Sequence, residues 1–297
     1  MNKLNPLSEN TVNQGFITLK LEMKTPGDSD IFQKKLKSVL PELYPAAELM
    51  GTIHYFRFIQ QTIKVFLLIL EHDGEQEPFL IELAKYFGPS LDELMIHVLH
   101  APAAPLSENA EKFAQWAKAH NLSSFTTYAG YKGISVRKIK SMASEAGISV
   151  TSEKESQLPL LWIMPIKSRF SLAALKLILK PLTGFLYKGA DEVGTVHFAR
   201  LTKLSDSEIG FFTAYDGPIE KYAQDFCSKL GPAFDLMFKF IIDPPPSPAS
   251  KNFVPFYEWA IKVNWLPIGF YSAYPGLSVQ DIKALVLNEN QKLPVSK

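Results

Sequence analysis

The sequence contains a single cysteine, and this scarcity excludes several kinds of site at once. Cys227 has no partner within the chain, so an intrachain disulfide and any zinc or iron–sulfur site built from several cysteines are ruled out. The 297 residues carry 31 basic and 30 acidic side chains, a net charge of +1, so no surplus of positive charge favours nucleic acid. We therefore expect a reducing, cytoplasmic location and no nucleic-acid partner.

The sequence signatures of several large enzyme classes are also missing. There is no P-loop, GxGxxG, HExxH or GxSxG, so NTPase, dinucleotide-binding and common hydrolase functions lack their usual support. The start of the chain, MNKLNPLSENTVNQG, has no apolar run of the kind found in a signal peptide, and we expect none. The longest apolar stretch, 172–186, is interrupted by Lys176 and Lys180 and is too short for a membrane span.

What the sequence does contain is a long repeat. Residues 51–74 read GTIHYFRFIQQTIKVFLLILEHDG and residues 194–217 read GTVHFARLTKLSDSEIGFFTAYDG, at an offset of 143 residues. Between 51–140 and 194–283 there are 25 identities in 90 positions without a gap, where ordinary composition gives roughly 6% by chance. The chain is therefore a tandem duplication of a domain-sized unit, with one repeat at 1–150 and the other at 151–297.

Both repeats are predicted to contain the same order of strands and helices. The expected elements of the first repeat are a strand at 16–23, a helix at 29–40 that Pro41 ends, a hairpin of 51–59 and 64–73, a helix at 77–99 broken at Gly88-Pro89, a helix at 107–120, a fourth strand at 123–130 and a short helix capped by Ser135. The second repeat follows the same plan from Pro159 onward.

This order, β-α-β-β-α-(α)-β, is the split βαβ or ferredoxin-like order. It predicts an α+β fold in which two tandem ferredoxin-like repeats pack their antiparallel sheets together as a pseudo-dimeric α/β barrel, with the helices outside. The order, the length and the fused duplication resemble the dimeric α/β-barrel superfamily. Its members include dye-decolourising peroxidases, chlorite dismutases, aldoxime dehydratases and small haem-free monooxygenases.

The resemblance implies redox chemistry, of peroxidase or monooxygenase type, on an apolar or aromatic small molecule. It also makes haem the one candidate cofactor. Dye-decolourising peroxidases carry a GxxDG motif, but here Leu70 and Thr213 stand where that motif has its first glycine, ahead of Asp73-Gly74 and Asp216-Gly217. The sequence departs from the peroxidase pattern at this point.

The matched histidines are the first candidates for chemistry. In GTVHFARL the two-residue period of a strand puts His197 on one face and Val196, Phe198 and Arg200 on the other. Val196 and Phe198 suit the helix-packed face, so we expect His197 and its counterpart His54 to face the space between the sheets. There, His197 would serve as a haem ligand, a general base or a hydrogen-bond donor, and the alternative is a structural histidine.

The matched arginines recur together with Asp73 and Asp216 on the paired strand. A structural Arg–Asp bridge within each hairpin is one interpretation, and an arginine that binds a carboxylate or a haem propionate is the other. The candidate catalytic residues are His197, Arg200, His54, Arg57 and Asp216.

Tyrosines flank the fourth strand of each repeat and are placed to line or close a cavity. Tyr271 and Tyr274 are candidate cofactor-binding residues together with His197. We expect no metal site, because His97 and His100, three residues apart on a helix, have no counterpart in the second repeat.

Residues 167–188, KSRFSLAALKLILKPLTGFLYK, are both basic and strongly apolar. They indicate either a core helix whose lysines reach solvent or a surface that meets an anionic membrane. The predicted partners are thus a small apolar or aromatic ligand and a peripheral membrane contact, with a homo-oligomer left open. Two functions also stay open: an oxidoreductase, and a non-catalytic ligand-binding or accessory protein.

Overall fold

The computed structural model describes residues 11–151 and 157–292, so residues 1–10, 152–156 and 293–297 lie outside the described residues. The first repeat contains β1 (Gln14–Glu22), α1 (Pro26–Met50), β2 (Ile53–Thr62), β3 (Val65–Asp73), α2 (Gln76–Met95), α3 (Ala110–His120), β4 (Ser124–Ala129) and α4 (Val136–Glu145). The second contains β5 (Gln157–Pro165), α5 (Arg169–Val193), β6 (Val196–Lys203), β7 (Glu208–Asp216), α6 (Ile219–Phe238), a 3-10 turn at Ala249–Lys251, α7 (Phe253–Lys262), β8 (Phe270–Ser272) and α8 (Val279–Lys292).

The fourth strand of each repeat belongs to the sheet of the other repeat. One antiparallel sheet has the order β1-β3-β2-β8, and the other has the equivalent order β5-β7-β6-β4. Thus β8 pairs with β2, with Tyr55 opposite Ser272, and β4 pairs with β6, with Tyr128 opposite Ala199. Each repeat therefore completes its sheet only with a strand from its twin.

Two matched asparagines hold the segments that cross between the sheets. The side chain of Asn121, just before β4, accepts the backbone N–H of Thr18 on β1 at 2.9 Å. Asn264, ahead of β8, accepts the N–H of Leu161 on β5 at 2.8 Å. Each crossing segment also forms a short bridge to the outer strand of the sheet that it leaves, so the two sheets are joined along both sides.

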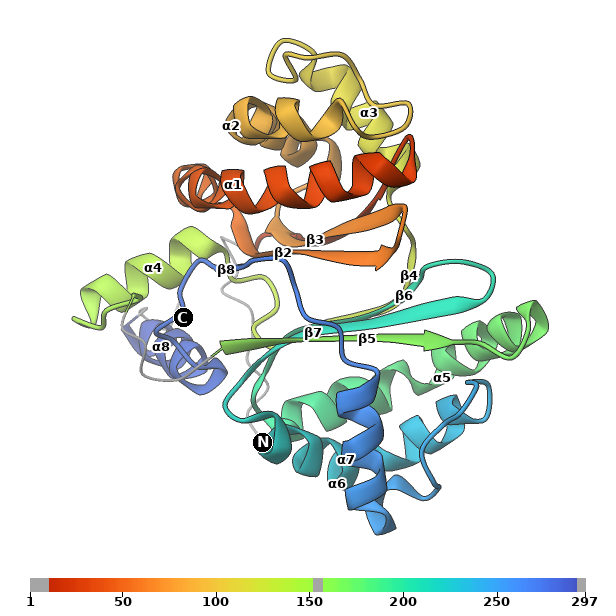
Figure 1. Cartoon of the computed structure of the whole chain (residues 1–297). Helices are drawn as coiled ribbons and strands as arrows, with labels where there is room; N and C mark the ends of the chain where they lie inside the picture. Colours follow the sequence, from red (N-terminus) through yellow and green to blue (C-terminus); the bar gives the residue numbers. More distant parts are fainter. Residues whose placement is uncertain (1–10, 152–156, 293–297) are drawn as a thin grey trace.

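The helices form the outer layers of the molecule (Figure 1). Helices α1, α2 and α3 cover one sheet, and α5, α6 and α7 cover the other. The remaining two, α4 and α8, pack against each other beside the sheets. The predicted α+β fold, two ferredoxin-like repeats with sheets face to face and helices outside, is confirmed.

The helices are longer than the proline positions predict. The sequence predicted that Pro41 ends the first helix, but α1 continues to Met50 with Pro41 and Pro45 inside it. It also predicted a break at Gly88-Pro89, whereas α2 is continuous. Both predictions were wrong because Pro41, Pro45 and Pro89 all lie on exposed faces, where water can bond the carbonyl that each ring leaves unpaired.

The strand exchange makes a prediction about the separated repeats. Expressed alone, 1–150 and 151–297 would each expose an unpaired edge strand and an uncovered sheet face, so we expect each fragment to aggregate or to remain unfolded. Mixed or co-expressed, they should assemble one to one, as measured by size-exclusion chromatography with light scattering. A stable, folded monomer of 1–150 would contradict the exchange.

Candidate functional site

A chain of hydrogen bonds crosses the molecule between the two sheets. Nε2 of His54 lies 2.9 Å from Oδ1 of Asp73, and its Nδ1 lies 2.7 Å from the hydroxyl of Tyr274. In the second repeat, Nε2 of His197 lies 2.6 Å from Oδ1 of Asp216, and its Nδ1 lies 3.0 Å from the hydroxyl of Tyr131. The two tyrosine hydroxyls are 2.6 Å apart and join the halves. The imidazoles and phenols are at most 2% exposed.

The exchanged strands put these groups together. Tyr274 follows β8 and reaches His54 on β2 of the other repeat, while Tyr131 follows β4 and reaches His197 on β6. At each end the aspartate also accepts the first backbone N–H of a helix: Val136 of α4 donates to Asp73. Val279 of α8 donates in the same way to Asp216, so the N-terminus of a helix faces each carboxylate.

The number of hydrogens in this chain is limited. Five contacts need five hydrogens. Two ionised aspartates, two neutral imidazoles and two phenols supply four, one from each imidazole and each phenol. Burial raises the pKa of Tyr131 and of Tyr274 well above the usual value, so both phenols keep their protons. The fifth hydrogen must therefore be an additional proton held somewhere along the chain.

A second buried polar cluster lies between the same sheets. Glu71 on β3 accepts two hydrogen bonds from Arg57, at 2.8 and 3.0 Å, and one from Arg200 of the other repeat, at 2.7 Å. Arg200 also donates to the carbonyls of Ile17 and Leu70. The position that matches Glu71 in the second repeat is Ala214, so one carboxylate serves both arginines.

The two clusters balance each other in charge. Burial raises the pKa of Glu71, but the two guanidinium groups more than offset it, so its pKa lies below the usual value. Burial lowers the pKa of Arg200 to about 10, against the opposing effect of Glu71, and leaves it protonated at neutral pH. The arginine cluster therefore carries one net positive charge. The hydrogen-bonded chain, with one proton beyond the four hydrogens counted above, carries one net negative charge.

The expected Arg–Asp bridges are absent, and this interpretation was wrong. Asp73 and Asp216 bond the histidines, and both arginines bond Glu71. The expected separation of His197 from Arg200 also fails. A bulge in β6 between Val196 and Phe198 shifts the register, so Arg200 and Phe198 point between the sheets beside His197. Phe198 was expected on the helix-packed face and lies on the other.

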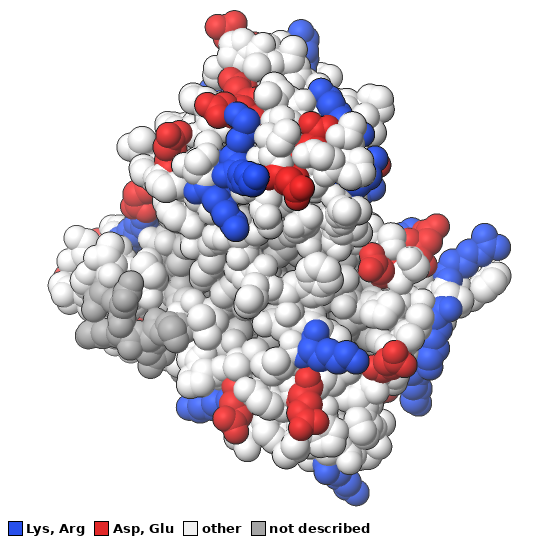
Figure 2. Space-filling view, in the orientation of Figure 1, with Lys and Arg blue, Asp and Glu red and all other residues white. Residues whose placement is uncertain are grey.

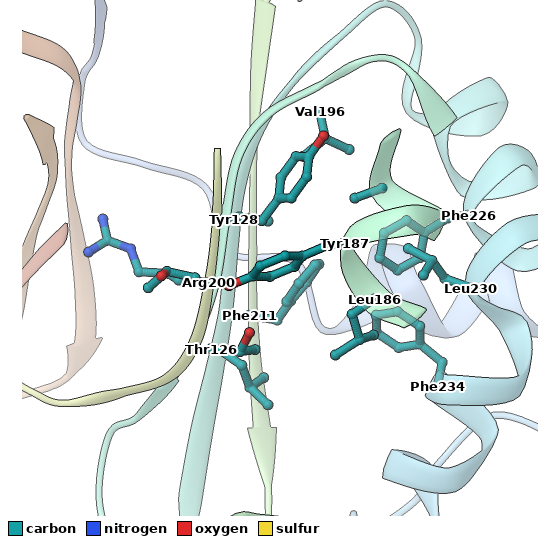
Figure 3. Close-up of a pocket in the computed structure, with 14 residues that line it drawn as sticks. Thr126, Tyr128, Leu186, Tyr187, Val196, Arg200, Phe211, Phe226, Leu230 and Phe234 are labelled. Carbon is teal, nitrogen blue, oxygen red and sulfur yellow. The ribbon is translucent and has the colours of Figure 1, made fainter. Parts of the chain in front are cut away.

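An apolar cavity lies on the outer side of the second sheet. It is enclosed by that sheet and by α5 and α6, has a volume of about 60 Å³ and has an almost wholly apolar lining. Figure 3 shows the lining side chains, which include Tyr128, Leu186, Tyr187, Val196, Phe211, Phe226, Leu230 and Phe234. Arg200 also borders the cavity, but its guanidinium points away, to the opposite face of the sheet (Figure 3).

In the first repeat the equivalent space is occupied by a side chain of the protein. Ala199 of the cavity wall matches Phe56, which is 0% exposed and stacks on Tyr271 with ring centroids 5.2 Å apart. Tyr44 and Phe87 flank the same ring at 5.7 and 5.6 Å. At the matching position the second repeat has only the methyl group of Ala199, which borders the cavity.

Comparison with known proteins adds a likeness of fold. No family model and no curated protein matches the chain. Among solved structures, a candidate monooxygenase from Fusobacterium nucleatum subsp. nucleatum ATCC 25586 is similar over 90% of this chain and 97% of its own, at 10% identity and a TM-score of 0.39. A candidate monooxygenase from Lactobacillus acidophilus NCFM covers 90% and 99%, at 9% identity and a TM-score of 0.33. An anthrone oxidase-like protein covers 91% and 97%, at 9% and 0.30.

At these values the similarity says nothing of ligand or activity, and the architecture is established by the strand pairing itself. Two four-stranded antiparallel sheets face each other, exchange their fourth strands and are joined through Asn121 and Asn264. The chain is a tandem-fused dimeric α/β barrel. Its two fused repeats correspond to the two subunits that such a barrel otherwise takes from separate chains.

The residues predicted from sequence fall into two groups in this α/β barrel. His54, His197, Arg57, Arg200 and Asp216 lie between the sheets, together with Tyr274, and the structure brings them into the two polar clusters. Tyr271 lies on the outer face of the first sheet against Phe56. Ala199 and Tyr187 of the cavity wall were not singled out from the sequence, and the signal for them was the mismatch of Phe56 with Ala199 in the aligned repeats. Tyr128 is one of the tyrosines beside the fourth strand that were expected to line or close a cavity, and it lies in the wall of this one.

The barrel interior does not fit a haem group on His197. Both ring nitrogens of His197 are hydrogen-bonded and the side chain is fully buried, so no lone pair is free to bind iron. The hydroxyl of Tyr274 is likewise hydrogen-bonded on both sides, to Nδ1 of His54 and to the hydroxyl of Tyr131. The outer cavity of about 60 Å³ is far smaller than a porphyrin. We therefore derive no chemistry through haem.

The hydrogen-bonded chain makes a prediction about stability. Tyr131→Phe removes one hydroxyl and leaves His197 and Tyr274 each short of a buried partner. The free energy of unfolding, measured by chemical denaturation, should therefore fall by about 1–3 kcal/mol. An unchanged free energy of unfolding in Tyr131→Phe would contradict the chain.

Proposed function

We propose that the chain binds a small apolar molecule containing one aromatic ring in the cavity of the second repeat. The observation that supports this is the twin relation of Phe56 and Ala199. The first repeat fills the equivalent space with a phenyl ring held between other aromatic rings. A ligand ring in the second repeat would take the same place.

The walls of the cavity are suited to such a ring. Tyr128 and Tyr187 match Tyr271 and Tyr44, and their ring centroids lie 5.9 Å apart, with Ala199 at the position of Phe56. Stacking of a ligand ring on Tyr128 would contribute about 0.5–1.5 kcal/mol beyond the burial of its surface.

The size of the cavity limits the ligand. A closed apolar cavity of roughly 150 Å³ takes up benzene, and this one has about 60 Å³. Tyr187 at its edge is 38% exposed, so the cavity reaches the surface there. A bound ring would therefore lie partly at the mouth, or α5 would move outward to admit it.

Redox chemistry on the bound ring is the finer part of the proposal. The hydroxyl of Tyr128 donates to Asp191 at 2.8 Å, and Asp191 also lies 3.4 Å from Nζ of Lys283. Burial raises the pKa of Tyr128 above its usual range, so the phenol stays protonated. A phenol with an adjacent carboxylate can give and regain its proton as it passes an electron, and it lies in the wall of the cavity.

The alternative, a binding or accessory protein without catalysis, rests on a different observation. The histidines and arginines shared by the repeats are buried and engaged with one another, which is the arrangement expected of groups that hold the fold together. Both alternatives place the ligand in the same cavity, and they differ in whether Tyr128 takes part in a reaction.

The twin relation predicts the number of binding sites. With toluene as the probe in isothermal titration calorimetry, the unmodified chain should show one site, Ala199→Phe none and Phe56→Ala two. Phe56→Ala should also lower the free energy of unfolding by about 3–5 kcal/mol, because it empties a packed core. Ala199→Phe should cost no more than about 1–3 kcal/mol through overpacking.

The control for this experiment is His197→Ala. We expect it to lower the melting temperature, since it leaves Asp216 and Tyr131 without their partner, and to keep one toluene site. Loss of toluene binding in His197→Ala at an unchanged melting temperature would place the site between the sheets instead. Unchanged binding in a folded Ala199→Phe protein would refute the outer cavity.

The redox part predicts oxygen uptake with a hydroquinone as the probe. The hydroquinone would lose two electrons and two protons to O₂, giving one quinone and one hydrogen peroxide. In an oxygen electrode, Tyr128→Phe should lose this activity, and the matched control Tyr271→Phe should keep it. A rate equal to that of buffer alone would leave the binding function intact and remove the redox part.

A further inference from the structure

One face of α5 is apolar and uncovered. Phe170 and Leu177 are 73% and 74% exposed, and Phe185 is 42% exposed. They are separated by seven and eight residues, about two helical turns each, so they lie along one side of the helix. Among the described helices, α5 is the one long and apolar enough, by length and composition, to cross a membrane, and only 17% of its most apolar stretch is buried. With 25 residues, α5 is longer than the apolar run at 172–186, which the sequence analysis judged too short for a membrane span.

The first repeat shows that the fold does not require this face. Helix α1 is the counterpart of α5 in the first repeat. Both helices have 25 residues, and their matched positions lie 143 residues apart, the offset of the repeat. At the positions of Phe170, Leu177 and Phe185 it carries Gly27, Lys34 and Glu42. An outer face with Lys34 and Glu42 at two of these positions serves the same layer of the barrel, so the fold does not require the apolar residues of α5.

The charged side chains along most of the same helix are all basic. Residues 169–188 contain four basic side chains and no acidic one, and the acidic Asp191 and Glu192 come only in the last turn. All four basic groups, Arg169, Lys176, Lys180 and Lys188, are exposed. Arg169 lies over the ring of Phe170, and Lys188 is 3.8 Å from Glu192. Figure 2 shows basic side chains projecting at the edge of the molecule where Figure 1 places the start of α5.

We propose that α5 docks on an anionic lipid surface, with Phe170, Leu177 and Phe185 in the interfacial layer and the basic groups against the headgroups. An apolar stripe flanked by basic residues of the same helix is complementary to that surface. The helix lies on the membrane and does not cross it, because its inner side is packed on α6. At Gly189 an added Cβ would lie 2.2 Å from Cδ2 of Leu230, so the two helices touch closely.

The position of α5 also relates this surface to the cavity. Leu186, Tyr187 and Ala190 of α5 line the cavity, and Phe185 is exposed next to them. A molecule dissolved in the lipid layer would meet the partly exposed Tyr187 at the cavity edge without passing through water. The docking itself does not depend on the ligand and is tested without it.

The experiment is co-sedimentation of the full chain with vesicles, and the twin helix supplies a matched control. Leu177→Glu should weaken binding to phosphatidylcholine vesicles that contain phosphatidylserine by roughly tenfold or more, since it removes an exposed apolar side chain from the docking face and adds a charge of the same sign as the lipid. Leu49 on α1 is 73% exposed, as Leu177 is, but lies outside the basic stripe, so Leu49→Glu should bind as the unmodified chain does.

The charged groups are tested separately. Lys176→Gln and Lys180→Gln should each weaken binding to the anionic vesicles by about fivefold and leave weak binding to pure phosphatidylcholine unchanged. No sedimentation of the unmodified chain with anionic vesicles would overturn the proposal, as would equal sedimentation of Leu177→Glu. A dimer in light scattering that Leu177→Glu dissociates, without vesicle binding, would show that a second copy covers this face and would also overturn it.

Discussion

The structure depends on the exchange of one strand between the repeats. Because β8 completes the sheet of β2, and β4 completes the sheet of β6, neither repeat has a full sheet of its own. The same exchange delivers Tyr274 to His54 and Tyr131 to His197, so the buried hydrogen-bonded chain exists only when both repeats are in place. Breaking a buried ion pair by removing one partner typically costs about 3–5 kcal/mol of folding stability. Substitutions of the polar residues between the sheets are therefore strongly destabilising.

The outer faces of the two sheets are under a weaker constraint, and there the repeats have diverged. The first sheet is packed with the rings of Phe56, Phe58 and Phe87. The second has Ala199, Leu201 and Leu230 at those positions, and Phe211, Phe226 and Phe234 replace leucines of the first repeat. The exchange of large for small side chains is not fully compensated, and the remaining space is the cavity. Function in a duplicated chain is therefore best sought where the repeats differ.

The sequence predicts much of this fold because duplication and hydrophobic period are local signals. The element order and the pairing of each hairpin follow from them. The exchange does not, since β4 occupies the same place along the chain whichever sheet it joins. The Arg–Asp interpretation failed for a related reason: strand parity assumes a regular register, and the bulges at His54 and His197 shift it. Glu71, which has no counterpart in the second repeat, could not be found by matching. The cavity could not be predicted from the sequence either, because the prediction requires knowing that the Phe56 side chain points outward, against α1 and α2.

The contact between Tyr131 and Tyr274 has a consequence for how this chain can vary. Each phenol touches its own duplicate, at equivalent positions on the pseudo-twofold axis. A substitution of one tyrosine thus alters the surroundings of the other. The effect of a substitution at either position therefore depends on the residue at its partner, and the two positions constrain each other. Phe56 and Ala199 sit on opposite outer faces and have no such coupling, which is why one gene fusion could preserve its symmetry at the centre and lose it at the periphery.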